Sequence, residues 1–294
     1  MWANGIGRRS TSRTVWCASA PACCCGLFCK RNNAKMYPIL FKIGPVNLYT
    51  YGFFLSLGFL AAILVAGREA KRTGLSEEHF YDLCFYLILA AIVGSRLLFV
   101  IVDPRPFLQN PLKIFAIWEG GLVFHGGLIA ALATAFFFIR RYKLPWKVTL
   151  DALAVGMPLG VMFGRLGCFM AGCCFGRPTD VPWAVRFTNP ETLCPLRVPV
   201  HPAQLYESIL SLGIFGVVFW LRKRKRFDGQ LLLTYFFLAG LARFTVEFFR
   251  APTELDPRGP DIIFHMPATQ VLALGIAVIS GTILVWAWRR TAKP

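Results

Sequence analysis

GRLGCFMAGCCFG, residues 164–176, is the stretch around which this chain is organised. It ends a strongly apolar segment, yet it contains Arg165, three cysteines and four glycines. An ionisable side chain in an apolar segment of a membrane protein usually faces the protein interior or water and marks a functional site. The glycines allow the backbone to approach a ligand or another helix closely. We therefore interpret the stretch as part of a site.

The composition of the 294-residue chain is typical of a membrane protein. Hydrophobic residues make up 56% of it and charged residues only 16%, against about 25% charged residues in soluble domains. A net charge of +17 is also seen in proteins that bind nucleic acid, but most Lys and Arg residues here follow apolar runs, where they set membrane topology. No nucleic-acid-binding motif is present, so we expect no nucleic-acid partner.

Seven apolar runs approach the length of about 20 residues that a helix needs to span a bilayer. They cover residues 48–67, 81–102, 122–140, 149–164, 204–221, 230–249 and 268–288. The fourth is expected to be short and interrupted by Pro158 and glycines. The predicted fold is all-α: a polytopic membrane protein with about seven transmembrane helices. No internal repeat of the kind found in many transporters is visible.

Basic residues predict the orientation of these runs. Clusters follow the odd-numbered runs, as at residues 222–226, whereas the alternate loops are poorer in positive charge. By the positive-inside rule, the odd-numbered runs end in the cytoplasm. The N-terminus is then outside and the C-terminus cytoplasmic. Loops 103–121, 165–203 and 250–267 share the outer side, and the longest is expected to form a small extracytoplasmic head.

The first 35 residues differ from the rest of the chain. They contain six basic residues and no acidic residue, and they lack the apolar core of a signal peptide. Our hypothesis is that translation begins at Met36, so that residues 1–35 are a disordered or mis-assigned extension. Residues 36–294 then form a single transmembrane domain.

The ten cysteines divide evenly between this extension and the body of the chain. Those in the body are Cys84, Cys168, Cys173, Cys174 and Cys194. None has the paired CxxC spacing of a zinc site. If the loop after Arg165 is extracytoplasmic, a disulfide among the last four is permitted, and the sequence leaves the pairing open.

Polar side chains cluster where the predicted topology brings loops to the outer half of the membrane. His125 opens the third run, and a lone histidine there is more often a helix cap than a catalyst. Its neighbours Gly126 and Gly127 favour a site, because they allow close backbone approach. Arg165 either snorkels to the interface or binds an anion, for which its planar fork is suited.

Two further clusters have helical spacing. Arg243, Glu247 and Arg250 lie on one helix face, where they form either a structural ion-pair ladder or a site in which the carboxylate orients the arginines towards an anion. Gln204 and Glu207 are three apart in a segment that is either a helix cap or part of a polar cavity. Tyr51 adds a hydroxyl near the outer side.

Together these groups suit a phospholipid substrate. Arginines hold a phosphate and stabilise it as a leaving group. A histidine accepts a proton from an incoming nucleophile.

These motifs resemble the prolipoprotein diacylglyceryl transferase family of bacterial inner membranes over about residues 36–288. They are His125-Gly126-Gly127-Leu128-Ile129, Gly164-Arg165-x-Gly167, His201-Pro202-x-Gln204-Leu205-Tyr206-Glu207 and Arg243-Phe244-x-x-Glu247-Phe248-x-Arg250. The resemblance implies seven spans with a periplasmic N-terminus. It implies transfer of diacylglyceryl from phosphatidylglycerol to the lipobox cysteine of a prolipoprotein in the bilayer, with release of glycerol 1-phosphate. This is the first step of lipoprotein maturation, and no metal or soluble cofactor is implied.

The resemblance also implies residue roles. Arg165 matches the family's phosphate-binding arginine, Arg243 a second essential arginine, and His125 the histidine proposed to activate the thiol. Catalytic roles are thus expected for His125, Arg243 and Glu247. Substrate-binding roles are expected for Arg165, Tyr51, Gln204, Glu207, Arg250, Gly126 and Gly127.

The signature departs from the family's commonest pattern, Gly-Arg-x-Gly-Asn-Phe-x-Asn-x-Glu-x-x-Gly. Cys168 and Ala171 replace its two asparagines, and Cys173 replaces its glutamate. Our hypothesis is that Cys168 forms a disulfide with Cys173 or Cys174, which holds the loop in place of the lost hydrogen bonds.

Two other functions account for part of the sequence. A membrane thiol oxidoreductase would use Cys168, Cys173 and Cys174, but such enzymes usually have a CxxC pair, and His125 and Arg243 would be unexplained. A transporter of an anionic solute would explain the arginines, but it predicts internal repeats and paired broken helices.

Overall fold

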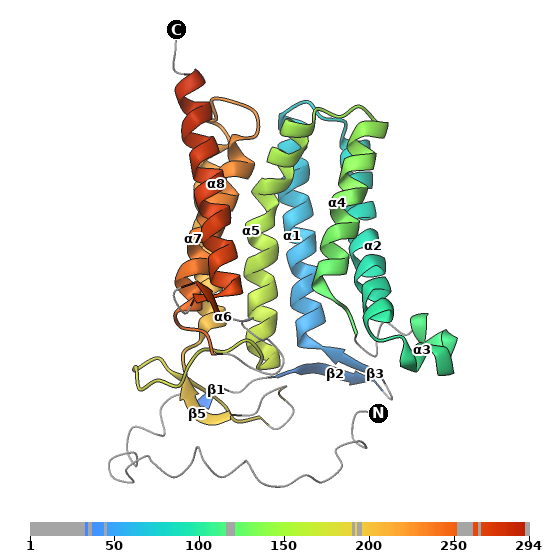
Figure 1. Ribbon diagram of the computed structural model, residues 1–294, viewed down its shortest axis with the longest axis vertical. Helices are drawn as coiled ribbons and strands as arrows, with labels where there is room; N and C mark the ends of the chain where they lie inside the picture. The colour runs from blue at the N-terminus through green and yellow to red at the C-terminus, as the bar shows by residue number, and fades with distance from the viewer. Residues whose placement is uncertain are drawn as a thin grey trace.

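The computed structural model describes residues 33–34, 37–43, 46–115, 121–189, 192, 196–251, 261–263 and 266–291. Seven long helices in this part of the chain form a bundle, with short strands gathered at one end (Figure 1). They are α1 (Thr50–Arg72), α2 (Glu77–Val102), α4 (Phe124–Arg141), α5 (Trp146–Ala171), α6 (Ala203–Leu221), α7 (Gln230–Glu247) and α8 (Ala268–Thr291).

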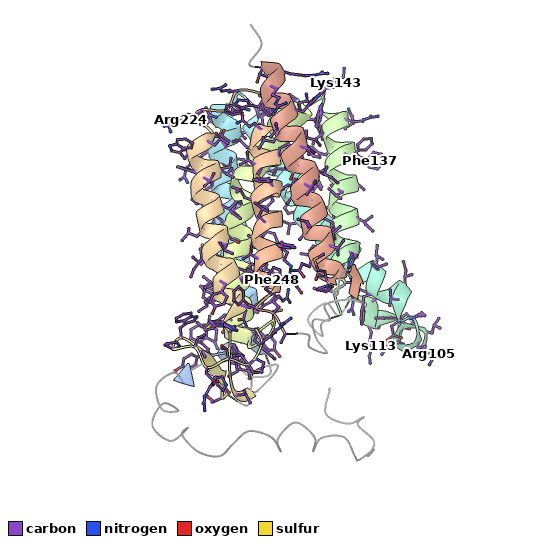
Figure 2. The ribbon with its side chains drawn as sticks, turned by 60° about the vertical axis from the view of Figure 1, so that its left-hand side comes forward. Arg105, Lys113, Phe137, Lys143, Arg224 and Phe248 are labelled. Atoms are coloured by element: carbon purple, nitrogen blue, oxygen red, sulfur yellow. The ribbon has the colours of Figure 1, made fainter. Side chains whose placement is uncertain are left out.

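The predicted all-α polytopic fold is confirmed. Each expected apolar run lies on one of the seven helices, and five of them (α1, α2, α5, α6 and α8) are long and apolar enough to cross a membrane. Large apolar side chains also point away from the bundle, as Phe137 does in Figure 2. This residue is 69% exposed. A broad exposed apolar surface is expected where a protein contacts lipid.

The fourth run differs from the prediction. It is neither short nor interrupted, because α5 continues for 26 residues through Pro158 and includes Arg165. Proline removes one backbone donor and disfavours the helix locally, but α5 packs against α1, α6 and α7, and this tertiary packing outweighs the local preference. The helix ends at Gly172, whose φ of 71° is the left-handed conformation that terminates helices.

The small elements lie together at one end of the bundle (Figure 1). β2 (Ile39–Ile43) and β3 (Val46–Tyr49) form a hairpin, as do β6 (Asp261–Ile263) and β7 (Met266–Pro267). β4 (Val185–Phe187) lies between antiparallel β5 (Leu196–Val200) and parallel β1 (Asn33–Ala34). α3 (Arg105–Gln109) is followed by a 3-10 turn, Pro111–Phe115. The three loops expected on one side therefore share one end.

The expected head is a folded unit on the α5–α6 connection. Phe175, Phe187 and Val200 form its buried apolar cluster. Asn33 and Ala34 pair with β4. The remainder of residues 1–35 and Met36 lie outside the described residues, so the hypothesis of a start at Met36 stays a prediction.

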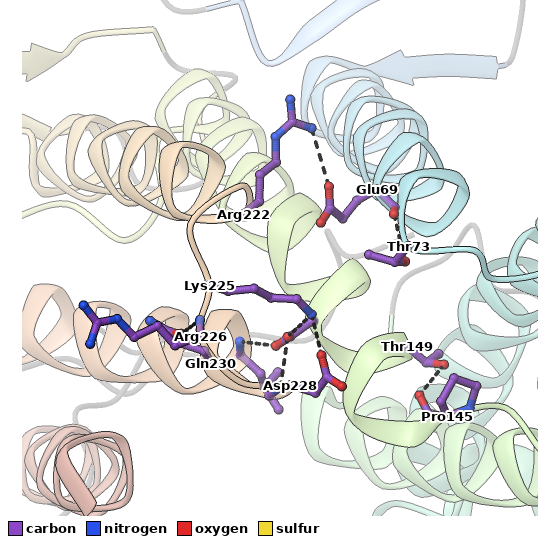
Figure 3. A network of polar contacts seen from close by, with 12 residues as sticks. Glu69, Thr73, Pro145, Thr149, Arg222, Lys225, Arg226, Asp228 and Gln230 are labelled. Carbon is purple, nitrogen blue, oxygen red and sulfur yellow. Dashed lines mark hydrogen bonds and ion pairs between the residues drawn. The ribbon is translucent and has the colours of Figure 1, made fainter. Parts of the chain in front are cut away.

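Polar networks join the helices at the opposite end (Figure 3). Asp151 is buried and accepts hydrogen bonds from Lys225 Nζ at 3.1 Å, Gly229 N at 2.9 Å and Leu232 N at 3.1 Å. Burial disfavours the charged form of Lys225, yet hydrogen bonds to Asp228 and Asp151 hold its pKa above the usual value. These contacts fix the start of α5 to the α6–α7 turn.

Glycines allow α2 and α4 to pack closely. A Cβ on Gly126 would overlap the carbonyl oxygen of Gly94, and one on Gly127 would lie 2.8 Å from the carbonyl oxygen of Ala91. In this structure, these glycines therefore allow α2 and α4 to approach each other closely. It fixes the first turn of α4, which contains His125.

Candidate active site

Four charged side chains from three helices form a continuous ion-pair network. Arg165 Nη2 of α5 lies 3.0 Å from Glu207 Oε1 of α6. The other carboxylate oxygen of Glu207 lies 3.5 Å from Arg243 Nη1 of α7. Arg243 Nη2 in turn lies 2.9 Å from Glu247 Oε2, one helical turn along α7. The structure thus brings together four of the residues that the sequence indicated.

The arginines of this network are more accessible than its carboxylates. The side chains of Arg165 and Arg243 are each 24% exposed, whereas those of Glu207 and Glu247 are 12% and 1% exposed. The carboxylates lie behind the guanidinium groups and orient them. Such an arrangement presents two preorganised cationic forks to an anion.

Arg250 adds a third positive charge to the same region. It follows the end of α7 and is 3% exposed, and its backbone bridges to Gly176 of the signature loop. Burial and then the charges of Arg243 and Arg165 hold the pKa of Arg250 below its usual value. Arg250 therefore adds positive charge close to Arg243 and Arg165.

The network borders apolar space. Glu207 and Arg243 line a cavity of about 180 Å³, together with Tyr235 of α7 and Val161 of α5. Tyr235 and Val161 also line an apolar cavity of about 470 Å³ between α1, α2 and α5. The charged groups are thus adjacent to a cavity that suits hydrocarbon.

Gln204 and its neighbours connect α6 to the signature loop. Gln204 is 1% exposed and its Nε2 donates a hydrogen bond to Cys173 O at 2.6 Å. Tyr206 Oη accepts a hydrogen bond from Trp183 Nε1 at 2.7 Å and lies 3.1 Å from His201 Nδ1. The segment is more than a helix cap, because it holds the head against the membrane helices.

Tyr51 and His125 lie at the same end of the bundle but outside the ion-pair network. Tyr51 packs against Gly167 and is close enough to interact electrostatically with Arg165 and Cys168. His125 is exposed in the first turn of α4, beside the Phe124 ring at 5.9 Å between centroids. Phe124 itself lines the larger apolar cavity. In the described part of the chain, the ion pairs do not extend to His125.

The cysteines of the signature are thiols, so the expected disulfide is wrong for this structure. Cys168, Cys173 and Cys174 are free, and their sulfurs lie within 4.8 Å of one another. Cys168 is on the last turn of α5, and the other two follow the helix end at Gly172. Cys194 lies outside the described residues.

Comparison with known proteins identifies the family. A family model described as prolipoprotein diacylglyceryl transferase matches residues 38–288. The chain belongs to this family. The matched range includes every candidate site residue from Tyr51 to Arg250.

Curated relatives support the same assignment to the prolipoprotein diacylglyceryl transferase family. A protein of Coxiella burnetii (strain Dugway 5J108-111) is 37% identical over 266 residues, 87% of this chain and 97% of its own. One from Geobacter sulfurreducens is 37% identical over 261 residues, which are 87% of this chain and 97% of its own. One from Clostridium tetani is 32% identical over 224 residues, 76% of this chain and 88% of its own. All three are named phosphatidylglycerol–prolipoprotein diacylglyceryl transferase, and nothing among them supports a thiol oxidoreductase.

Arg96 is a residue of this family member that our sequence reasoning missed. It is 6% exposed, and it donates from Nε to Ile114 O at 3.0 Å and from Nη1 to Gly121 O at 3.3 Å. Its guanidinium also stacks on Phe99 and Phe107. Arg96 thereby ties α2 to the 3-10 turn at Ile114 and to Gly121, which precedes α4. The signal was available, since it is an arginine inside an apolar run, as Arg165 is.

Proposed function

We propose that this protein transfers the diacylglyceryl group of phosphatidylglycerol to the cysteine thiol of a prolipoprotein and releases glycerol 1-phosphate. The observation that carries the proposal is the pairing of Arg165 and Arg243 through Glu207, beside an apolar cavity. A phospholipid needs both parts, a cationic site for its phosphate and hydrocarbon space for its acyl chains. Membership of the transferase family supports the same reaction.

In this proposal the arginines bind the phosphate of phosphatidylglycerol. Arg165 and Arg243 donate to its oxygens and exchange part of their contact with Glu207 for contact with the lipid. They stabilise the charge that builds up on the leaving oxygen when the bond between carbon and that oxygen breaks. Glu247, buried behind Arg243, keeps its guanidinium directed at the phosphate.

The remaining site residues position the lipid and the loop. Tyr51 offers a hydroxyl beside Arg165, and Arg250 adds positive charge behind the signature loop. Gln204 fixes that loop through Cys173. Gly126 and Gly127 allow α4 to approach α2, which fixes the first turn of α4, where His125 follows Phe124 of the apolar cavity.

The acceptor thiol must lose its proton before it attacks. The thiolate sulfur forms a bond to the glyceryl carbon, and the electron pair of the broken bond stays on the phosphate oxygen. We assign the thiol proton to His125, whose ring is accessible at the start of α4. The acceptor cysteine lies in the lipobox of a signal peptide.

The location proposed is the bacterial inner membrane. Basic residues gather at the end of the bundle where Lys143 and Arg224 lie (Figure 2), and the positive-inside rule makes this end cytoplasmic. The site lies at the other end, near Phe248, so it would open to the outer half of the bilayer. The N-terminus would be outside and the C-terminus inside.

The proposal is tested with phosphatidylglycerol labelled in its diacylglyceryl part and a lipobox peptide. Wild type should transfer label to the peptide, and Arg165→Ala and Arg243→Ala should each lose about 100-fold or more in rate, because each removes donors to the phosphate. Arg224→Ala, at the opposite end, is the matched control and should retain activity. A correctly folded wild type with no transfer would contradict the proposal.

A further inference from the structure

The three sulfurs of the signature form a cluster of soft ligands. Cys168, Cys173 and Cys174 have their sulfurs within 4.8 Å of one another, and those of Cys173 and Cys174 are 3.8 Å apart. Zinc–thiolate bonds of about 2.3 Å arranged tetrahedrally place neighbouring sulfurs about 3.8 Å apart. Small side-chain rotations would therefore bring all three sulfurs to bonding distance of one ion.

The backbone supports this convergence. Cys174 has φ of 60°, a left-handed conformation that a residue with a side chain rarely adopts. Gly172 makes a first turn of the same kind, at φ 71°. The two turns fold the loop back so that Cys173 and Cys174 lie beside Cys168 at the helix end. A backbone outlier that brings reactive side chains together is typical of functional sites.

The number of ligands indicates the kind of site. Among the described residues, the group of mutually close ligand atoms has three members, all of them partly accessible cysteines. Structural zinc sites have four protein ligands, whereas catalytic sites have three and keep one position open. Three thiolates and Zn(II) carry a net charge of −1, which the neighbouring Arg165 complements, since its charge interacts with all three cysteines.

We propose that Cys168, Cys173 and Cys174 bind one Zn(II) ion as thiolates and leave its fourth coordination position to the acceptor thiol of the prolipoprotein. This use of the ion rests on the function proposed above. A thiol that coordinates zinc is deprotonated. Its proton passes to His125. Its sulfur then bonds to the glyceryl carbon and leaves the zinc as a neutral thioether, while the phosphate oxygen keeps the electron pair of the broken carbon–oxygen bond.

Metal binding is measured first, on the full chain purified in detergent and loaded with zinc. Elemental analysis should give about one zinc per wild-type chain, and Cys168→Ser and Cys173→Ser should each lose most of it. Cys84→Ala, at a buried cysteine of α2, should retain the metal. So should a full-length chain in which the five cysteines of residues 1–35 are serines. Wild type that binds no zinc would overturn the proposal.

The open position is tested without turnover. Cobalt(II) in place of zinc should give a thiolate charge-transfer band, and a lipobox peptide should shift the cobalt spectrum, whereas the same peptide with serine for cysteine should not. A spectrum that neither peptide changes would overturn the role of the fourth position. So would loss of the bound ion in Cys194→Ser, because the site would then be a closed four-cysteine site.

The transfer assay separates this proposal from the proposed function. Removing zinc with a chelator should lower the transfer rate at least tenfold, and restoring zinc should recover it. Full activity in the zinc-free chain would overturn the metal's role and leave the transferase intact. A zinc-binding chain without transferase activity would overturn the proposed function, and with it the use of the ion.

Discussion

Glu207 contacts two arginines from different helices, and the geometry of the candidate site depends on it. One carboxylate oxygen pairs with Arg165 at 3.0 Å and the other faces Arg243 at 3.5 Å. Without this negative charge the two guanidinium groups would repel each other. We therefore propose that Glu207 is a positioning residue, which fixes how the two guanidinium groups lie relative to each other.

Glu207→Gln is expected to lower the rate of transfer roughly 10- to 100-fold, because small misplacements of catalytic groups have effects of that size. The effect should fall mainly on kcat, since both arginines remain. The assay is labelled diacylglyceryl transfer at several lipid concentrations. Glu77→Gln, which breaks an exposed ion pair with Lys71, is the control and should change little. An unchanged kcat in Glu207→Gln would contradict the positioning role.

At the scale of the elements, the contact between α2 and α4 depends on glycine. Gly126→Ala would push a methyl group into the Gly94 carbonyl, and overpacking of this kind costs about 1–3 kcal/mol. We expect a lower thermal unfolding midpoint and reduced transfer, because the first turn of α4 holds His125. Gly213→Ala in α6 has open space for a Cβ and should be neutral or slightly stabilising. Equal midpoints for the two variants would refute this account.

The start of α5 depends on Asp151. This carboxylate is 1% exposed and receives Lys225 and two backbone N–H groups, so its removal leaves buried donors without a partner. Asp151→Ala should lower the free energy of unfolding by roughly 3 kcal/mol, the usual effect of breaking a buried ion pair. Unfolding of the protein in detergent measures this. Asp228→Ala, which removes a more exposed partner of Lys225, should cost much less.

At the scale of the whole molecule, the two ends of the bundle differ in the elements and side chains that they contain. One end has the strands and the head (Figure 1), together with the candidate site. The other has the basic turns and the polar network that includes Lys225, Asp228 and Gln230 (Figure 3). We propose from the positive-inside rule that the second end is cytoplasmic. The site would then face the side from which an exported substrate is reached.

Paired insertions of alkaline phosphatase test this orientation, because that enzyme needs disulfides that form outside the cytoplasm. An insertion after Asp180, exposed in the head, should be active in cells. An insertion after Lys223, exposed at the α6–α7 turn, should be inactive. The reverse pattern would show that the protein is inverted relative to our prediction.

Much of the architecture follows from the sequence. Apolar runs predict the long helices, because burial in lipid depends on local composition and length. Basic clusters predict which helix ends share a side of the membrane. The sequence also singles out Arg165 and Arg243 as candidates, because an ionisable side chain in an apolar segment usually marks a functional site. The extent of α5 was not predicted, since Pro158 and the glycines are unfavourable locally and only packing against neighbouring helices decides the matter.

What the tertiary structure decided is which groups meet. Sequence spacing pairs Arg243 with Glu247 on one helix face, but it cannot place Glu207 of α6 between Arg165 and Arg243. Nor does spacing show that three cysteines converge, because their convergence depends on two left-handed residues after a helix end. Periodicity and composition act along the chain and so determine the helices and their order. Contacts between helices depend on packing in three dimensions, and the candidate site is made of such contacts.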